Sequence, residues 1–194
     1  MHAPVLVTPA DANDPIITTA EAKLHCHIDG AEEDALVAAL VAAATKHLDG
    51  YAGILGRALV TQTWRQNFDD FSTCFRLPLQ AATISSITSQ NTAGQIATIT
   101  ATNYALQEDA LGSFVRFKDD YSFPSDLYQT KAIAVNFTAG YGAAAEVPEP
   151  IKQAMLLLIG HWYANREAVN VGNIVTPLPF AVDALLELYR RVGI

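Results

Sequence analysis

Residues 147–167 read Val147-Pro-Glu-Pro-Ile-Lys-Gln-Ala-Met-Leu-Leu-Leu-Ile-Gly-His-Trp-Tyr-Ala-Asn-Arg-Glu167, and this stretch specifies both ends of a helix. Pro148 and Pro150 disfavour helix before them, and a proline suits the first helical position, where its missing N–H is not needed. Glu149 lies where a carboxylate stabilises the positive end of the helix dipole, and Arg166 falls in the last turn, where a cation is favoured. We therefore predict a helix from Pro150 to about Arg166. Its apolar stripe at helical spacing comprises Ile151, Met155, Leu158, Ile159 and Trp162.

The composition is that of a globular protein with one domain. The chain has 194 residues, of which 51% are hydrophobic, enough to form a buried core. Twelve basic and twenty acidic residues give a formal charge of −8, which argues against a surface that binds nucleic acid by neutralising phosphates. No apolar run approaches the roughly 20 residues of a membrane span, and residues 1–7 lack the features of a signal peptide. We expect a protein made and used in a cytoplasm.

The first third of the chain predicts an arm and two helices. Residues 1–15 have no periodicity, which indicates an extended arm or a loosely held terminus. Thr18-Thr-Ala-Glu21 fits a capping box, so a short helix should run to about His25. A second helix is expected from about Glu32 to Tyr51. Its apolar stripe comprises Leu36, Val37, Leu40, Val41, Ala44, Leu48 and Tyr51.

The middle of the chain has the composition and alternation of strands. The first strand begins near Leu59 and runs through Phe68, where β-branched and aromatic residues alternate with polar ones. Turn-forming clusters separate further candidates at spacings that favour an antiparallel meander over βαβ units. These candidate strands are residues 83–89, 95–100, 104–107, 113–118 and 131–137.

The pattern reverts to helix after residue 142. The helix at Pro150 is followed by an expected loop through Gly172 and Pro177-Leu-Pro179, and by a last helix from about Ala181 to Val192. The order of helices, sheet and helices predicts an α+β fold.

One string matches a nucleotide-binding motif. Gly140-Tyr-Gly-Ala-Ala-Ala145 follows a strand and fits the G-x-G-x-x-G/A fingerprint. That fingerprint requires a helix to start within the glycine turn, whereas Glu146-Val-Pro-Glu-Pro150 delays the helix here. We interpret the glycines as residues of a turn that needs positive φ.

Other reactive side chains fit structural roles better than chemical ones. His25-Cys-His27, with His47, suggests a metal site, but alternate residues of a helix point to different faces. Cys26 and Cys74 lack a CxxC spacing, so we expect reduced, buried thiols. His161-Trp-Tyr163 lies in an apolar helical pattern, which favours a partly buried histidine. The carboxylate runs Glu32-Glu33-Asp34 and Asp119-Asp120 fit a helix start and a turn. We therefore predict no catalytic, metal or cofactor-binding residue.

The landmarks, taken in order, resemble the head-tail connector, or adaptor, proteins of long-tailed phages, prophages and gene transfer agents. The resemblance spans most of the chain, although residues 70–130 carry few of its landmarks and residues 169–176 do not align with it. The segments that carry it are Leu6-Val-Thr-Pro9, Thr18-Thr-Ala-Glu-Ala-Lys23, Glu33-Asp-Ala-Leu-Val-Ala-Ala-Leu40, Gly56-Arg-Ala-Leu-Val-Thr-Gln-Thr-Trp64, Phe137-Thr-Ala-Gly-Tyr-Gly142, Val147-Pro-Glu-Pro-Ile-Lys-Gln-Ala154, His161-Trp-Tyr-Ala-Asn-Arg-Glu-Ala168, Leu178-Pro-Phe180 and Asp183-Ala-Leu-Leu186.

The resemblance implies a single connector domain of residues 1–194. It would consist of an extended arm (1–17), N-terminal helices (18–56), a β-rich insertion (57–140) and C-terminal helices (148–194). Such proteins assemble as a ring, usually dodecameric, beneath the portal of a filled capsid in the virion neck, after synthesis in the host cytoplasm. They extend the DNA channel and offer a surface to a stopper or tail-completion protein. No cofactor is implied, and DNA would pass through the lumen without specific binding.

The resemblance also implies contact residues. The C-terminal helix and tail of similar proteins reach into the portal, while the N-terminal arm could supply ring contacts. The portal-contact candidates are Phe180, Leu185, Leu186, Leu188, Tyr189, Arg190, Arg191 and Ile194, and the subunit-contact candidates are Val5, Leu6 and Val7. Exposed leucines on a terminal helix favour a partner, but packing of at least two of them onto the Pro150 helix of the same chain is the simpler expectation.

Two alternatives remain open. One is another neck component, such as a tail-side terminator, which would share composition and partners. The other is a small metal- or nucleotide-binding enzyme that uses His25, Cys26, His27 or the turn at Gly140.

Overall fold

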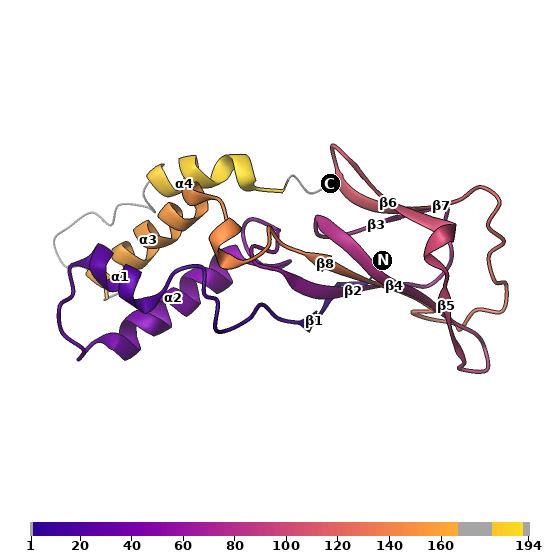
Figure 1. Cartoon of the computed structure of the whole chain (residues 1–194), viewed down its shortest axis with the longest axis horizontal. Helices are drawn as coiled ribbons and strands as arrows, with labels where there is room; N and C mark the ends of the chain where they lie inside the picture. Colours follow the sequence, from indigo (N-terminus) through magenta and orange to yellow (C-terminus); the bar gives the residue numbers. More distant parts are fainter. Residues whose placement is uncertain (1, 167–179, 192–194) are drawn as a thin grey trace. The chain divides into compact units, whose positions relative to one another are not determined.

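The chain forms two compact units, one of strands and one of helices (Figure 1). The computed structural model describes residues 2–166 and 180–191, without the side chain of Phe180. The β unit comprises residues 57–141 together with the arm up to Ala10. The helical unit comprises Asp11–Gly56 and the described residues from Gly142 to Arg191. The predicted α+β class is therefore confirmed, with helices before and after a set of antiparallel strands.

The helical unit contains four α-helices and two short 3-10 helices within the described residues. In chain order they are α1 (Thr19–Cys26), α2 (Asp34–Leu48), η2 (Ala144–Glu146), α3 (Glu149–Ala164), α4 (Phe180–Leu186) and η3 (Glu187–Tyr189). None of these helices has the length and hydropathy of a membrane span.

The capping box predicted for α1 is present. The Glu21 N–H donates to Thr18 Oγ1 at 3.1 Å, and the Thr18 N–H donates to a Glu21 carboxylate oxygen at 2.7 Å. Hydrogen bonds from Thr18 lower the pKa of Glu21. The helix ends one residue later than predicted, with His27 in the left-handed region at φ 57°. Reciprocal capping therefore fixes the start of α1 as the sequence indicates.

The predicted stripes of α2 and α3 contribute much of the core of the helical unit, although Leu36, Leu40 and Trp162 are only half-buried. Tyr51 lies beyond the end of α2 and is exposed, contrary to prediction. α3 begins at Glu149, so Pro150 is its second residue, and it ends at Ala164 before Arg166. The buried residues of these two helices are Val37, Val41, Ala44, Leu48, Ile151, Ala154, Met155, Leu158 and Ile159.

The last helix is shorter than predicted. α4 ends at Leu186, and one 3-10 turn, η3, follows it. This change of helical type rotates the residues after Leu186 away from the positions that an α-helix would give them. The expected loop through Gly172 and the prolines at 177 and 179 lies outside the described residues.

The β unit contains eight strands. They are β1 (Val5–Thr8), β2 (Gln62–Phe68), β3 (Cys74–Arg76), β4 (Ala81–Gln90), β5 (Ile96–Ile99), β6 (Tyr104–Asp109), β7 (Gly112–Phe117) and β8 (Ile133–Ala139). A single-turn 3-10 helix, η1 (Ala101–Asn103), precedes β6.

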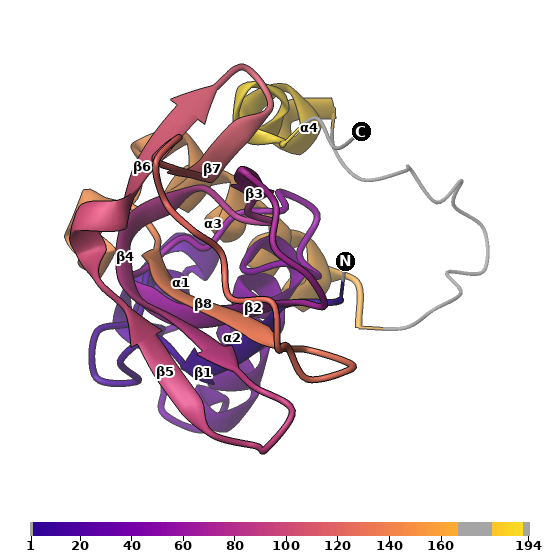
Figure 2. The same ribbon diagram turned by 90° about the vertical axis from the view of Figure 1, so that its right-hand side faces the viewer.

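The strands form two antiparallel sheets with the orders β1-β2-β8-β4-β5 and β3-β7-β6. Figure 2 shows β8 between β2 and β4. β8 pairs along its whole length with β2, from Gln62↔Ala139 to Phe68↔Ile133. The predicted meander is therefore wrong, because among the described strands only β4–β5 and β6–β7 are hairpins. β1 and β2 also pair, but α1 and α2 lie between them in the sequence, and β8 lies between β2 and β4 in the sheet. Alternation in the sequence specifies which face of a strand is buried, but not which strand pairs with it.

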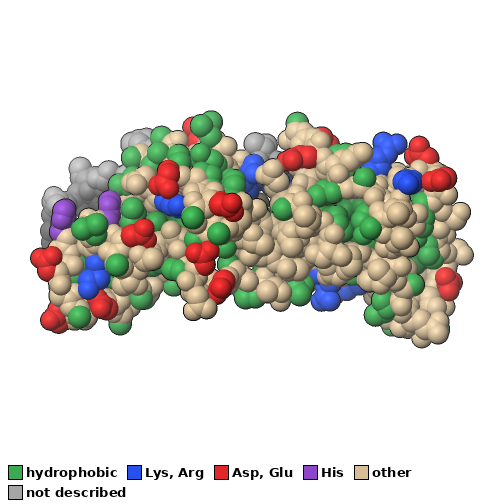
Figure 3. All heavy atoms as spheres, viewed as in Figure 1, with side chains coloured by type: hydrophobic (Ala, Val, Ile, Leu, Met, Phe, Trp, Pro, Cys, Tyr) green, Lys and Arg blue, Asp and Glu red, His purple; other side chains and the backbone are tan. Residues whose placement is uncertain are grey.

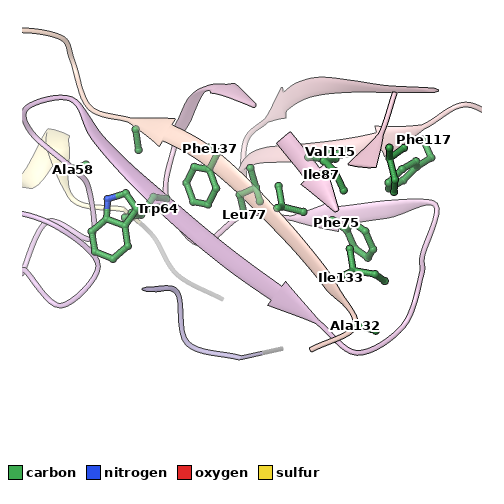
Figure 4. Close-up of a cluster of buried hydrophobic side chains, with 14 residues drawn as sticks. Ala58, Trp64, Phe75, Leu77, Ile87, Val115, Phe117, Ala132, Ile133 and Phe137 are labelled. Carbon is green, nitrogen blue, oxygen red and sulfur yellow. The ribbon is translucent and has the colours of Figure 1, made fainter. Parts of the chain in front are cut away.

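The two sheets enclose one hydrophobic core. Figure 4 shows Phe137 of β8, Ile87 of β4 and Val115 of β7 in this cluster. β8 presents every second residue to it, since Ile133, Val135, Phe137 and Ala139 are all buried. Aromatic rings extend the core beside Phe117, whose ring packs against those of Phe71, Phe75, Tyr104, Tyr121 and Phe123.

Two strands were not expected. β3 has only three residues, and β1 lies in the segment predicted to be an aperiodic arm. All four side chains of β1 are exposed, so the strand does not show the alternation of apolar and polar residues by which a half-buried strand is recognised in a sequence. Backbone pairing with β2 holds it, from Val5↔Arg65 to Thr8↔Thr63, and Gln66 Nε2 donates to the His2 carbonyl at 2.7 Å.

The position of Phe137 yields a stability prediction. Phe137→Ala should destabilise the β unit by about 3–5 kcal/mol, because the site is fully buried and the vacated volume cannot close completely. Urea unfolding in a Trp162→Phe background leaves Trp64 of β2 as the fluorescent reporter of this unit. Ile96→Ala, at a side chain that is 71% exposed, should change stability by no more than about 0.5 kcal/mol. Equal effects of the two substitutions would contradict the assigned core.

Candidate interaction surfaces

The two histidines near the end of α1 lie in structural positions. His25 Nε2 lies against α3, where a Cβ added at Gly160 would be 3.3 Å away. His27 forms the C-cap, and its N–H donates to the Leu24 carbonyl at 3.3 Å. Within residues 2–166 and 180–191, no three His, Cys, Asp or Glu side chains are grouped so that they could hold a metal ion.

The prediction of buried thiols is only partly correct. Burial raises the pKa of Cys26, which is half-buried, whereas Cys74 is exposed on β3. Cys74 opens a short edge strand of the smaller sheet, where its neighbour Phe75 takes the buried position. Both cysteines are unpaired thiols.

The glycines at the end of β8 form a turn. Gly140 and Gly142 have φ values of 129° and 136°, which side chains rarely adopt. A Cβ at Gly140 would collide with the Val60 carbonyl, and one at Gly142 would collide with the Glu146 carboxylate. α3 begins only at Glu149, after η2. The interpretation of these glycines as turn residues is confirmed, and the helix N-terminus that a dinucleotide site needs is not in the turn.

A hydrogen-bonded cluster joins the start of α2 to the end of α3, and the sequence did not reveal it. The Tyr163 hydroxyl donates to one oxygen of Glu33, and the Arg166 guanidinium donates to the other at 2.6 Å. The guanidinium also lies over the Tyr163 ring, 4.5 Å from its centroid. Hydrogen bonds from Tyr163 and Arg166 lower the pKa of Glu33. Arg166 thus pairs with Glu33, 133 positions away in sequence, and its Nε also donates to the Tyr163 carbonyl in the last turn of α3 at 3.3 Å.

The C-terminal candidates differ in exposure. Leu186 is fully buried within the helical unit, Leu185 and Tyr189 are half-buried, and Leu188 is 89% exposed. Arg190 is exposed and donates to Asp183 at 2.6 Å. The half-buried Arg191 donates its N–H to the Leu55 carbonyl at 2.9 Å. The side chain of Phe180 and all of Ile194 lie outside the described residues. Of the described apolar candidates, Leu188 is therefore the one that presents most surface to a partner.

The N-terminal candidates form an exposed apolar strand at a sheet edge. Val5 and Leu6 are each 43% exposed and Val7 is 51% exposed, although β1 is paired with β2. Consecutive residues of a strand point to opposite faces. Neither face of β1 is therefore well covered.

A shallow groove lies along α1, and sequence reasoning did not identify it. Leu24, on its rim, is 79% exposed, and the neighbouring Lys23 forms an ion pair with Asp34 of α2. The stripe of α1 is too short for periodicity to show that Leu24 points outward. The residues that line the groove are Thr19, Ala20, Lys23, Leu24, His27, Ile28, Asp29 and Asp34.

The acidic character of the chain belongs mainly to the sequence of the helical unit. Residues 11–56 and 142–191 contain thirteen of the twenty acidic residues but six of the twelve basic ones. The β unit has seven acidic and six basic residues, so its sequence is nearly neutral. On the face in Figure 3, acidic side chains are most numerous over the helices.

Comparisons with known proteins found one family and several solved structures that are similar to this chain. The family described as head completion protein matches residues 15–192. No curated protein matches the chain. Three solved structures are similar over 100% of this chain and 97% of the matched chain. They are the neck of an empty gene transfer agent particle computed with C6 symmetry (23% identity, TM-score 0.78), the virion of a native gene transfer agent particle (23%, 0.74) and the neck of a native particle computed with C12 symmetry (21%, 0.72).

The cluster around Glu33 predicts how stability depends on pH. A carboxyl group with a lowered pKa in the folded state stabilises the fold above its ordinary pKa of 4.5, and this contribution is lost as the pH falls through the lowered value. Glu33→Gln should therefore lower the melting temperature at neutral pH, and the deficit should shrink as the pH is lowered from neutral to values below the ordinary pKa of 4.5. Thermal melts across this range measure it. A deficit that is constant with pH would contradict the assigned ionic contribution.

Proposed function

The chain belongs to the head completion protein family, and on this premise we propose that it joins the portal to the tail or stopper in the neck of a phage or gene transfer agent particle. The family match covers almost the whole chain and identifies a structural protein, not an enzyme. This match is the observation that carries the proposal. The full-length similarity in fold to chains of gene transfer agent necks supports it.

The proposed assembly is a ring, dodecameric by analogy with the related necks. Two of the similar structures were computed with C6 and C12 symmetry. A ring uses heterologous contacts, so each subunit must present two different surfaces to its neighbours. The exposed residues Val5, Leu6 and Val7 of β1 are suited to one of these surfaces.

The helical unit would be the connector-type core, and the β unit would be an insertion into it. The chain leaves the helical unit after Gly56 and re-enters it at Gly142. α2 and α3 flank the insertion in sequence and pack against each other. Together the two units would act as one connector domain.

The proposed portal contact uses the C-terminal segment. Val182 and Leu186 are buried and anchor α4 in the helical unit, which leaves Leu188 on η3 as an exposed apolar side chain. An isolated apolar residue at the centre of an interface can contribute much of the binding energy. The other candidates of this contact lie close to Leu188 in the sequence. They are Leu185, Tyr189, Arg190 and Arg191, with Phe180 before them and Ile194 after them.

The charge of the chain is compatible with a DNA channel. A lining that neutralises few phosphates releases few counterions and binds duplex weakly. The sequence of the helical unit, with thirteen acidic and six basic residues, has this property. DNA would therefore slide through the ring without a specific binding site.

Deletion of the gene tests the proposal in a producing strain. Capsids should fill with DNA but fail to retain it or to join tails, because the portal exit would lack its next component. Electron microscopy counts filled, empty and tailed particles, and re-expression of the wild-type chain should restore all three. Failure of capsid assembly or of DNA cutting would contradict a neck role. A normal yield of tailed particles would do so equally.

Substitution of Leu188 tests the proposed portal contact. Leu188→Asp should reduce the amount of chain bound to purified portal at least tenfold, since truncation of a central contact costs about 2 kcal/mol or more. The side chain is 89% exposed, so the fold should be unaffected. The matched control is Leu24→Asp, at a leucine of the same unit that is 79% exposed. Equal binding by the two variants would contradict a specific role for the C-terminal segment.

A further inference from the structure

The larger sheet of the β unit has two open edges. Among the described strands, β1 pairs only with β2, and β5 pairs only with β4. The outer side of an edge strand presents backbone N–H and C=O groups that can pair with another chain. These two edges are therefore candidate sites for contact between subunits.

Both edges lack the charged side chains that commonly protect a sheet from such pairing, although each strand has only four residues and the register of β1 shifts between Leu6 and Thr8. β1 reads Val-Leu-Val-Thr and β5 reads Ile-Ala-Thr-Ile, so neither strand contains a charged residue. Their exposed side chains include Leu6, Val7 and Ile96. Pro4 and Pro9 flank β1 and limit its length, but no proline lies within either strand. Natural edge strands commonly carry charges that prevent association.

The smaller sheet of the same unit provides a contrast. Its edge strands β3 and β6 carry Arg76, Glu108 and Asp109. The Arg76 guanidinium donates to both carboxylate oxygens of Asp109, at 2.9 and 2.8 Å, and lowers the pKa of Asp109 to about 2. The chain thus places charges at the edges of one sheet and omits them from the edges of the other.

The directions of the strands match the geometry of a ring. Every neighbouring pair in the five-stranded sheet is antiparallel, so β1 and β5 run in the same direction. Rotation about a ring axis preserves the component of each strand along that axis, and a ring contact joins two different surfaces. The two open edges meet both requirements, since they are different surfaces with matching direction.

We propose that β1 of one copy pairs in parallel with β5 of the next copy, so that the larger sheet continues from subunit to subunit. This inference rests on the proposed function, because it specifies the contact that builds the ring. Backbone hydrogen bonds would supply the pairing. The exposed apolar side chains of β1 would then pack beside Ile96 of the neighbouring copy.

Engineered disulfides can distinguish this contact from bonds within one chain. β1 and β5 of a single chain are separated by four strand spacings, or about 19 Å at roughly 4.8 Å per spacing. A disulfide requires Cα atoms within about 7 Å of each other. Any disulfide between these two strands must therefore join two chains.

The experiment uses assembled particles that carry the full chain with both native cysteines removed (Cys26→Ala and Cys74→Ser). Four double variants combine Leu6→Cys or Val7→Cys with Ala97→Cys or Thr98→Cys. These combinations cover both faces of each strand. After mild oxidation, at least one double variant should give a ladder of covalent oligomers on a non-reducing gel, and the single variants should give no band larger than a dimer.

The absence of a ladder from all four variants, with the chain present in particles at the wild-type level, would overturn the inference and leave the neck role intact. Absence of the wild-type chain from particles would overturn the proposed function, and this inference with it.

A second measurement avoids cysteine chemistry. Ile96→Lys should reduce incorporation into particles at least tenfold, because it places a charge in the proposed strand pairing. Leu111→Lys, at a side chain of the same unit that is 40% exposed in the β6–β7 turn, should be incorporated normally. Normal incorporation of Ile96→Lys would overturn the proposed pairing.

Discussion

The fold depends on the pairing of β8 with β2 on one side and β4 on the other. This pairing returns the chain to the point where the β unit begins, and there the Tyr141 N–H donates to the Leu59 carbonyl at 2.9 Å. The two ends of the insertion therefore lie together, although 85 residues, from Arg57 to Tyr141, separate them in the sequence. Because the ends meet, α2 and α3 can pack against each other as consecutive helices would. The glycine turn at the end of β8 makes this close return possible.

Local signals in the sequence predict most of the helices and strands. The features that they do not predict depend on contacts between residues far apart in the sequence. The capping box at Thr18 and the stripes of α2 and α3 depend on neighbours within a few residues, so pattern alone identified them. The place of β8 depends on partners more than 40 residues away in sequence, and alternation cannot select them. β1 was missed because backbone pairing, without burial of its side chains, holds it in place. The pairing of Arg166 with Glu33 could not be predicted, because nothing local in the sequence indicates a partner 133 positions away.

The sequence predicts which segments carry the candidate contact residues, and the structure shows which of these side chains are exposed and which are buried. The sequence indicated an apolar C-terminal helix, but the change from α4 to η3 determines that Leu186 is buried while Leu188 is exposed. Helical periodicity assumes a constant rotation per residue, so it could not reveal this difference. The sequence likewise could not show that β5 is an edge strand, because this depends on the order of strands in the sheet. Family resemblance supplied the architectural role, and the structure identifies which side chains are available for it.

Electron cryomicroscopy of the neck, in particles whose copy of this chain carries a tag, tests the central claim most directly. The account predicts a ring of this chain directly beneath the portal, with the segment from Phe180 to Arg191 facing the portal and DNA in the lumen. Density for the tag on the capsid shell or along the tail tube would contradict it. So would a neck in which no ring beneath the portal carries the tag.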